Sequence, residues 1–364
     1  MKILVFISHP AQFLFFKNQI SELRERGHRV FILIKTKDIL AGLLDELGWE
    51  YYNILPNERG KSKFQIIWSL LIRDLKLFRF AIRRDIDLLI GTDASLAHVG
   101  KILCKPCITT LEDDYGVIKK LADLTYPFTT NILVPKICDV GRWERKKIGY
   151  DGYMKLAYLH PNRFFADRNR VKIVNDKPYY LIRLSGLSAH HDFGIKGISY
   201  ELLDSIISRL SLLGNVYISS EKELPASYDR YRLSIPLTEM HHYLNFADML
   251  ICDSQSMAVE ASMLGVPNIR ISSFVGRISV LEELEHKYNL TFGVKPVDEI
   301  RLFEKLEELL SISNLKDIFQ LRRQKMLSEK IDVTAFMVWF VENYPASVKV
   351  MKENPDYQDR FKIR

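Results

Sequence analysis

A chain of 364 residues is longer than one hydrophobic core usually supports, so its length predicts two domains. The composition is 47% hydrophobic and 27% charged, without low-complexity tracts or short repeats, and this excludes a disordered or fibrous protein. The net charge of +7 is modest, and we find no nucleic-acid recognition module, so nucleic acid is not an expected partner.

The first residues, MKILVFISHP, have the pattern of a buried strand. One basic residue precedes the apolar run and no small-residue cleavage site follows it, so we expect a strand and no signal peptide. The cysteines Cys104, Cys107, Cys138 and Cys252 are scattered, and the sequence CKPC lacks the second ligand pair of a zinc site. These features indicate a reducing cytoplasm and no metal site.

Strands and helices alternate along the first half of the chain, which is typical of a parallel sheet. Residues 13–27 have the pattern of a helix that ends at Gly27. The predicted strands are residues 2–8, 28–35, 86–92, 106–111 and 130–136.

Residues 61–84 form a segment with both apolar and basic side chains at helical spacing. Its apolar positions are Phe64, Ile67, Trp68, Leu71, Leu75, Phe78 and Ile82. Its basic positions are Lys63, Arg73, Lys76, Arg79, Arg83 and Arg84. Charges interrupt the apolar runs too often for a membrane span. Two interpretations stay open: a long packing helix, or a basic and aromatic face that rests on an anionic membrane.

A basic, turn-rich stretch interrupts the alternation and is interpreted as a linker over residues 161–178. A second series follows, with a helix over residues 200–214 and strands at residues 179–185, 215–220, 247–253 and 267–272. Helices are expected from Val297 to about Tyr344, followed by a charged, irregular end. We therefore expect an N-terminal domain over residues 1–160, a C-terminal domain over residues 179–340 and a tail over residues 341–364.

The sequence ICDSQSMAVEASMLGVPNIRIS, residues 251–272, combines a strand, a cluster of polar residues, a helix and a second strand. The polar cluster is Asp253, Ser254, Gln255 and Ser256. A helix start offers unpaired N–H groups and partial positive charge, which suit a phosphate. Glu260 lies one turn further along and could accept ribose hydroxyls, while Met257 could pack. The alternative is that the serines only cap the helix.

The stretches DSQSMAVEASMLGVP, SFVGRISVLEELEHKYNL, HPAQFLFFKNQISELRERGHRV and DGYMKLAYLHP carry a family resemblance. The chain resembles a prokaryotic family of unassigned function related to sugar-nucleotide glycosyltransferases of the GT-B fold. It is more distantly similar to non-hydrolysing UDP-N-acetylglucosamine 2-epimerases. The resemblance implies an α/β protein of two facing Rossmann-like domains, with the nucleotide on the second and the acceptor on the first. The sequence SHPAQF departs from it, because those transferases have a glycine-rich loop there.

The resemblance gives a frame for polar residues that follow other strands of the second domain. Arg183 and Lys196 are candidates to neutralise a diphosphate leaving group, a task that a metal performs elsewhere. The remaining candidate contacts to the nucleotide-sugar are Ser185, His190, Ser219, Glu221 and His241. His190 and His191 are adjacent and point apart, so they cannot form a two-histidine metal site. A surface role for the histidines stays open.

Two groups in the first domain are candidates for the catalytic base. His9 follows the first strand, in the loop expected to face the cleft, and could take a proton from an acceptor hydroxyl at neutral pH. Its alternative role is a hydrogen bond within a tight turn. Asp113 and Asp114, beside Glu112, follow another strand and could raise one another's pKa. Solvated loop acids are the alternative for these carboxylates.

The leading interpretation is a metal-independent glycosyltransferase that uses a nucleotide-sugar donor and needs no further cofactor. It would act in the cytoplasm, at the inner membrane face if residues 61–84 contact lipid, in cell-surface polysaccharide or glycolipid assembly. The second interpretation is an epimerase of the same architecture, in which residues 112–114 act on the sugar ring. The third is a non-catalytic protein that binds sugar nucleotides.

Overall fold

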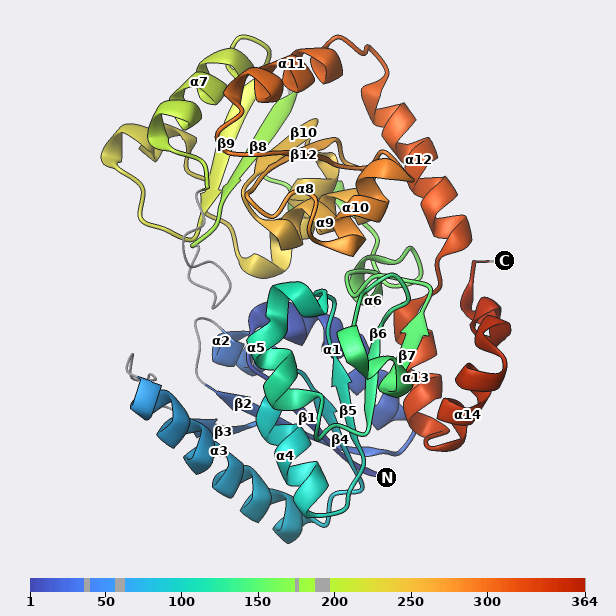
Figure 1. The fold of residues 1–364 in the computed structure, drawn as a ribbon. Coiled ribbons are helices and arrows are strands. Elements are labelled where there is room, and N and C mark those ends of the chain that lie inside the picture. Colours follow the sequence, from blue (N-terminus) through green and yellow to red (C-terminus); the bar gives the residue numbers. More distant parts are fainter. Residues whose placement is uncertain (36–39, 56–62, 174–176, 187–196, 364) are drawn as a thin grey trace. The chain divides into compact units, whose positions relative to one another are not determined.

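The computed structural model describes residues 1–35, 40–55, 63–173, 177–186 and 197–363 (Figure 1). The chain divides into two compact units, Met1–Tyr158 with Ile331–Arg364, and Leu159–Lys330. Each unit has its own parallel β-sheet with helices around it. This is the α/β class with two parallel sheets that the sequence predicts.

Within its described residues, the first unit has a seven-stranded parallel sheet in the order β3-β2-β1-β4-β5-β6-β7. The strands are β1 (Lys2–Ile7), β2 (Arg29–Lys35), β3 (Tyr52–Leu55), β4 (Leu88–Gly91), β5 (Cys107–Thr110), β6 (Asn131–Pro135) and β7 (Lys147–Tyr150). β1 lies near the middle, and Ile3–Ile7 are all buried. A strand covered on both faces tolerates a continuous apolar run, which KILVFI supplies.

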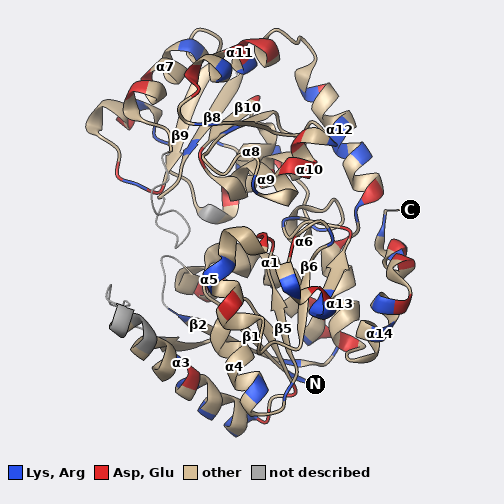
Figure 2. Ribbon diagram, viewed as in Figure 1, with Lys and Arg blue, Asp and Glu red and all other residues tan. Residues whose placement is uncertain are grey.

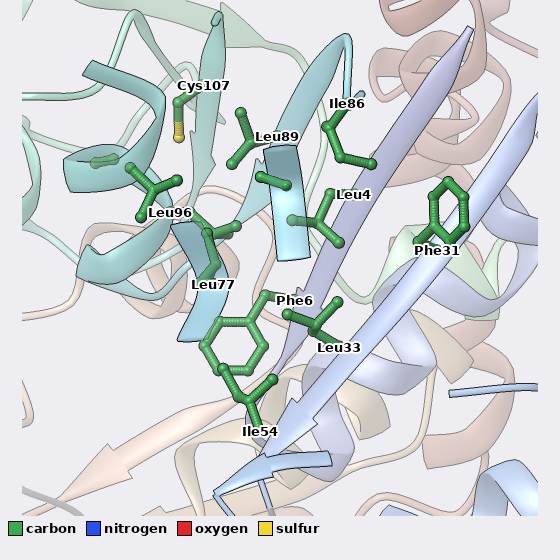
Figure 3. Packing of buried hydrophobic residues seen from close by; sticks show 13 residues of the cluster. Leu4, Phe6, Phe31, Leu33, Ile54, Leu77, Ile86, Leu89, Leu96 and Cys107 are labelled. Carbon is green, nitrogen blue, oxygen red and sulfur yellow. The ribbon is translucent and has the colours of Figure 1, made fainter. Parts of the chain in front are cut away.

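Helices cover this sheet and close a core that Figure 3 shows from nearby. Leu4 and Phe6 of β1 pack with Phe31 and Leu33 of β2 and with Leu77. The helices are α1 (Pro10–Glu25), α2 (Leu40–Glu46), α3 (Lys63–Arg84), α4 (Ala94–Ile102) and α5 (Tyr115–Thr125). Leu77 belongs to α3, so the predicted helix over residues 61–84 contributes to the core with one face.

The second unit has a five-stranded parallel sheet in the order β12-β11-β10-β8-β9 among its described residues. Its strands are β8 (Tyr179–Leu184), β9 (Asn215–Ser220), β10 (Met249–Cys252), β11 (Asn268–Ile271) and β12 (Phe292–Val294). Its helices are α7 (Tyr200–Leu210), α8 (Met240–Phe246), α9 (Gln255–Leu264), α10 (Ser279–His286), α11 (Glu299–Leu310) and α12 (Leu315–Glu329). α6 (Leu156–Leu159) lies at the boundary of the two units.

The chain returns to the first unit after Lys330, whereas we expected the second domain to extend to residue 340. Thr334 of α13 (Val333–Glu342) donates a hydrogen bond to the carbonyl of Ala157 at 2.7 Å. Glu342 accepts one from Arg26 at the end of α1 at 2.9 Å. The apolar helix α13 therefore belongs to the core of the first unit.

The last residues are helical, so the expectation of an irregular end is wrong. They form α14 (Ala346–Glu353) and the 3-10 helix η5 (Pro355–Phe361). The side chain of Gln358 accepts a hydrogen bond from the backbone N–H of Asp151 at 2.7 Å, and the ring of Tyr357 packs on Trp339. In α14, Ser347 and Met351 are buried and lie four residues apart. The many charged residues around them make this short helical pattern hard to recognise in the sequence.

The other 3-10 helices are η1 (Gly141–Lys146), η2 (Arg168–Arg170), η3 (Ala226–Tyr231) and η4 (Leu237–Glu239). The four cysteines are free thiols. Cys107 of the CKPC sequence packs in the core, where burial raises its pKa to about 12. Across the described ranges, no helix combines the length and the apolar character that a membrane crossing requires.

Candidate functional site

The polar residues predicted to bind a nucleotide-sugar gather at one edge of the second sheet. β8, β9 and β10 are parallel neighbours, so their carboxyl ends meet at this edge. Ligands of open α/β sheets bind beyond the carboxyl ends of the strands. The start of α9 follows β10 directly and lies at the same edge.

α9 begins at Gln255, inside the polar cluster that the sequence places before the helix. Ser254 is its N-cap, and its hydroxyl accepts a hydrogen bond from the N–H of Met257 at 3.3 Å. Gly265 ends the helix in the left-handed conformation, with φ of 68°. Within the described residues, the N–H groups of Gln255 and Ser256 form no hydrogen bond. The helix start therefore presents two donors.

Asp253 holds the chain on both sides of residues 187–196, which lie outside the described structure. Its carboxylate accepts hydrogen bonds from the N–H of Ser185 at 2.6 Å and from the N–H of Ile198 at 3.4 Å. The side chain is buried, and burial raises its pKa, although the hydrogen bonds act in the opposite direction. Asp253 thus holds the backbone at Ser185 and at Ile198.

Arg183, at the end of β8, connects β8 to β9. Its guanidinium donates a hydrogen bond to the hydroxyl of Ser219 at 2.6 Å and forms a close ion pair with Glu221. The other carboxylate oxygen of Glu221 accepts a hydrogen bond from the N–H of Gly186 at 2.8 Å. The structure therefore brings Arg183, Ser219 and Glu221 together after their strands, but in bonds to one another. Ser185 is bonded through its N–H to Asp253 instead.

The side chain of Gln255 is held by Arg270 and Ser272, which were not predicted as site residues. Arg270 of β11 donates a hydrogen bond to its side-chain oxygen at 2.9 Å, and its amide nitrogen contacts the hydroxyl of Ser272. Arg270 is fully buried, and burial lowers its pKa although Glu285 and Glu282 oppose this shift. A charged residue inside the apolar strand PNIRIS is the signal that could have identified it.

Glu260 of α9 is buried beside His241 of α8. The distance between the Nε2 atom of His241 and a carboxylate oxygen of Glu260 is 3.5 Å. The ring of Phe164 packs edge-on against His241, with centroids 6.0 Å apart. The next residue, His242, accepts a hydrogen bond from the N–H of Asp167, and burial lowers its pKa. The structure thus places Glu260, His241 and the ring of Phe164 next to one another.

The other predicted contacts to the donor are placed as follows. Ser256 is half-buried on the first turn of α9, and Met257 is buried. His190 and Lys196 lie outside the described residues. Within the described ranges, no group of three or more His, Cys, Asp or Glu side chains is arranged to hold a metal ion.

The candidate catalytic residues of the first unit follow β1 and β5. His9 is the exposed N-cap of α1, and its Nδ1 atom accepts a hydrogen bond from the N–H of Ala11 at 3.2 Å. The carboxylate of Asp114 is buried and accepts a hydrogen bond from the N–H of Asp139 at 2.8 Å. Asp113 is half-buried.

Glu112, next to these aspartates, has structural partners. Its carboxylate accepts hydrogen bonds from the N–H of Met154 at 2.7 Å and from the ammonium group of Lys155 at 2.8 Å. The three consecutive acids therefore have different surroundings, and Glu112 is committed to an ion pair.

Comparison with known proteins assigns the fold. No protein-family model matches the chain, and no curated protein matches its sequence. Among solved structures, spinosyn rhamnosyltransferase SpnG complexed with spinosyn aglycone is similar, with a TM-score of 0.62 at 14% identity over 94% of this chain and 100% of that one. MurG of Acinetobacter baumannii is similar with a TM-score of 0.61 at 13% identity over 94% and 99%.

A UDP-GlcNAc 2-epimerase from Methanocaldococcus jannaschii is also similar, with a TM-score of 0.60 at 14% identity over 89% of this chain and 99% of that one. Two glycosyltransferases and an epimerase thus match almost the whole chain at low identity. The chain has the GT-B fold, which is the fold class that its sequence predicts.

Proposed function

We propose that this protein is a glycosyltransferase that moves a sugar from a nucleotide-sugar donor to an acceptor in cell-surface polysaccharide or glycolipid assembly. The observation that carries the proposal is the start of α9, where two N–H groups are open at the carboxyl edge of the sheet and Glu260 lies one turn further along. These are the groups that a nucleoside diphosphate requires.

The donor would be held by complementary contacts along α9. The N–H groups of Gln255 and Ser256, with the hydroxyl of Ser256, would donate to the diphosphate, because the positive end of the helix attracts anions. The carboxylate of Glu260 would accept hydrogen bonds from the ribose hydroxyls. His241 and Phe164 would lie near the base of the nucleotide. Gln255 would act through its backbone, since its side chain is held by Arg270.

The second candidate is a nucleotide-sugar epimerase, because the epimerase from Methanocaldococcus jannaschii has nearly the same TM-score as MurG. Incubation with UDP-, GDP- and CMP-sugars, with and without a lipid-linked acceptor, separates the two functions. We expect nucleotide release that depends on the acceptor. Interconversion of the donor without acceptor would instead support the epimerase, and neither reaction would leave a sugar-nucleotide-binding protein.

Activity is expected to survive chelation by EDTA. The charge that develops on the diphosphate would be neutralised by the helix start and by Arg183, and Lys196 is proposed as a second cation. Arg183 is paired with Glu221, whose side chain is 51% exposed, so a diphosphate could compete with that carboxylate. Turnover measured before and after chelation checks this. Loss of turnover that magnesium or manganese restores would contradict the assignment.

We also propose that the protein works in the cytoplasm at the inner face of the membrane, where a lipid-linked acceptor would be available. The support comes from α3, because hydrophobic side chains remain exposed on the helix that also packs in the core.

A further inference from the structure

α3 has an exposed apolar stripe opposite the face that packs in the core. Leu77 and Ala81 are buried, whereas the stripe consists of Trp68, Leu71, Leu75 and Ile82, which are 59%, 55%, 50% and 53% exposed. The members of the stripe are three, four and seven residues apart, so they lie along one side of the helix. Four neighbouring large apolar side chains on a helix indicate a surface that contacts an apolar partner.

α3 also has basic residues, which are blue in Figure 2. Their helical spacing places three of them in a row beside the apolar stripe. Lys76, Arg79 and Arg83 are three and four residues apart, and two of them directly follow stripe residues in the sequence. Lys76 donates a hydrogen bond to the carbonyl of Ile54 at 3.0 Å. Within the described part of the chain, the guanidinium groups of Arg79 and Arg83 form no hydrogen bond or ion pair. Two exposed cations are therefore available to an anion.

A cavity of about 490 Å³ lies on the other side of this basic row, between α3 and β3. It is lined by Tyr52, Lys76, Arg79, Phe80, Arg83 and Arg84. Arg84 is fixed there, because it lies over the rings of Tyr52 and Phe80 and donates a hydrogen bond to the hydroxyl of Tyr52 at 3.1 Å. That hydroxyl in turn donates to Glu50, which is not among the lining residues.

The cavity has the chemistry of a phosphate site. Among the described residues, its polar lining consists of four cationic side chains and a tyrosine, without an acidic side chain. Guanidinium groups bind phosphate oxygens through two parallel hydrogen bonds, which favours phosphate over smaller anions. The volume exceeds that of a phosphate alone and leaves room for the group that carries it.

We propose that this cavity binds the phosphate headgroup of an anionic phospholipid while the apolar stripe enters the acyl layer. This inference deepens the proposed location at the membrane face and rests on it. The order across the helix surface is apolar stripe, basic row and cavity, which matches the order of acyl chain, phosphate and remaining headgroup in a lipid. A free phosphate would use the cavity but would leave the apolar stripe uncovered.

The experiment measures how the full chain floats with vesicles of different composition. The vesicles contain phosphatidylcholine alone, phosphatidylcholine and phosphatidylglycerol, or phosphatidylcholine and oleate, the last two at equal surface charge. The parent protein is expected to prefer the phosphatidylglycerol vesicles. The double variant Arg79→Gln, Arg83→Gln should bind them roughly 30-fold more weakly, since each basic residue contributes at such a surface. The control Lys119→Gln, Lys120→Gln removes the same charge from exposed positions on α5 and should change binding less than threefold.

A third variant, Trp68→Ser with Leu75→Ser, separates the cavity from the apolar stripe. It should lose vesicle binding but keep the parent's affinity for glycerol phosphate in solution, which the arginine variant should lose. Equal vesicle binding by the parent and the arginine variant, or an equal loss in the lysine control, overturns the proposal. So does glycerol phosphate binding by a parent that ignores all vesicles, because the site then serves a free phosphate.

UDP affinity, measured on the same preparations, should be unchanged in every variant. This measurement distinguishes the two proposals. A parent protein that binds vesicles but no nucleotide would refute the proposed donor site without contradicting the lipid site.

Discussion

Replacing His9 by asparagine is expected to lower kcat about 100- to 10,000-fold, the usual contribution of a general base. The side chain follows β1, at the N-cap of α1, and an imidazole is a common general base. Asparagine is among the best N-cap residues, so its side-chain oxygen can still accept from the N–H of Ala11. The variant therefore removes the base and keeps the start of α1.

The hydrogen bond from Ala11 places a condition on this mechanism. Because Nδ1 accepts that bond, the neutral ring carries its proton on Nε2. Nδ1 can take a proton from the acceptor hydroxyl only after the hydrogen bond from Ala11 breaks. Nε2 can do so only after the ring has exchanged the proton that it carries there. His9→Ala would also remove the cap, at a cost of about 1 kcal/mol in unfolding free energy. Comparing the turnover and melting of the two variants separates catalysis from capping.

Asp113 and Asp114 are the rival bases, and the dependence of kcat/KM on pH distinguishes them. A histidine base gives an acidic limb near pH 6 to 7, whereas an unperturbed aspartate gives one near pH 4. If the pKa of the aspartate is raised, its acidic limb would fall in the pH range expected for histidine. The profile must therefore be measured on the variants as well. If His9→Asn keeps its turnover while Asp113→Asn or Asp114→Asn loses it at unchanged donor affinity, the base is a carboxylate and His9 only caps α1.

Replacing Glu260 by alanine is expected to weaken the binding of UDP or another nucleoside diphosphate by about 2 to 4 kcal/mol, roughly 30- to 700-fold in Kd. The loss corresponds to two hydrogen bonds between a carboxylate and the ribose hydroxyls. Isothermal calorimetry with UDP, GDP and TDP measures it. Glu260→Gln, which keeps the shape and one acceptor, should lose less.

The neighbouring His241 supplies the control for this prediction. Its ring lies 3.5 Å from Glu260, so the carboxylate could serve only to pair with the histidine. In that case Glu260→Ala would change the melting temperature and leave the Kd unaltered, which would remove Glu260 from the donor site. His241→Ala keeps the carboxylate, so we expect it to weaken binding by a smaller factor than Glu260→Ala.

The strands that the sequence predicts are those with long, buried apolar runs. KILVFI and NVYISS agree with β1 and β9 to within a residue, because their length makes the pattern clear. β3, β7 and β12 were missed, and each of them lies at the edge of its sheet and is only partly buried. The equally short β4, β5, β10 and β11 lie inside a sheet and are buried throughout, so their apolar runs are clear.

The sequence predicts where the polar residues of the candidate site gather, but it predicts only some of their contacts. The rule that polar residues follow strands identified Arg183, Asp253 and Ser254, and they do gather at one sheet edge. The bonds among these residues depend on strand order, which places β8 between β9 and β10. Sequence reasoning treated them as ligand contacts, whereas Arg183 and Asp253 hold neighbouring protein groups.

A structure of the protein with UDP, TDP or GDP bound tests the central claim most directly. We predict that the diphosphate lies on the N–H groups of Gln255 and Ser256, that the ribose hydroxyls meet the carboxylate of Glu260, and that the base lies toward His241. A nucleotide bound at another edge of the second unit, or on the first unit, with the start of α9 left empty, would contradict the proposed donor site.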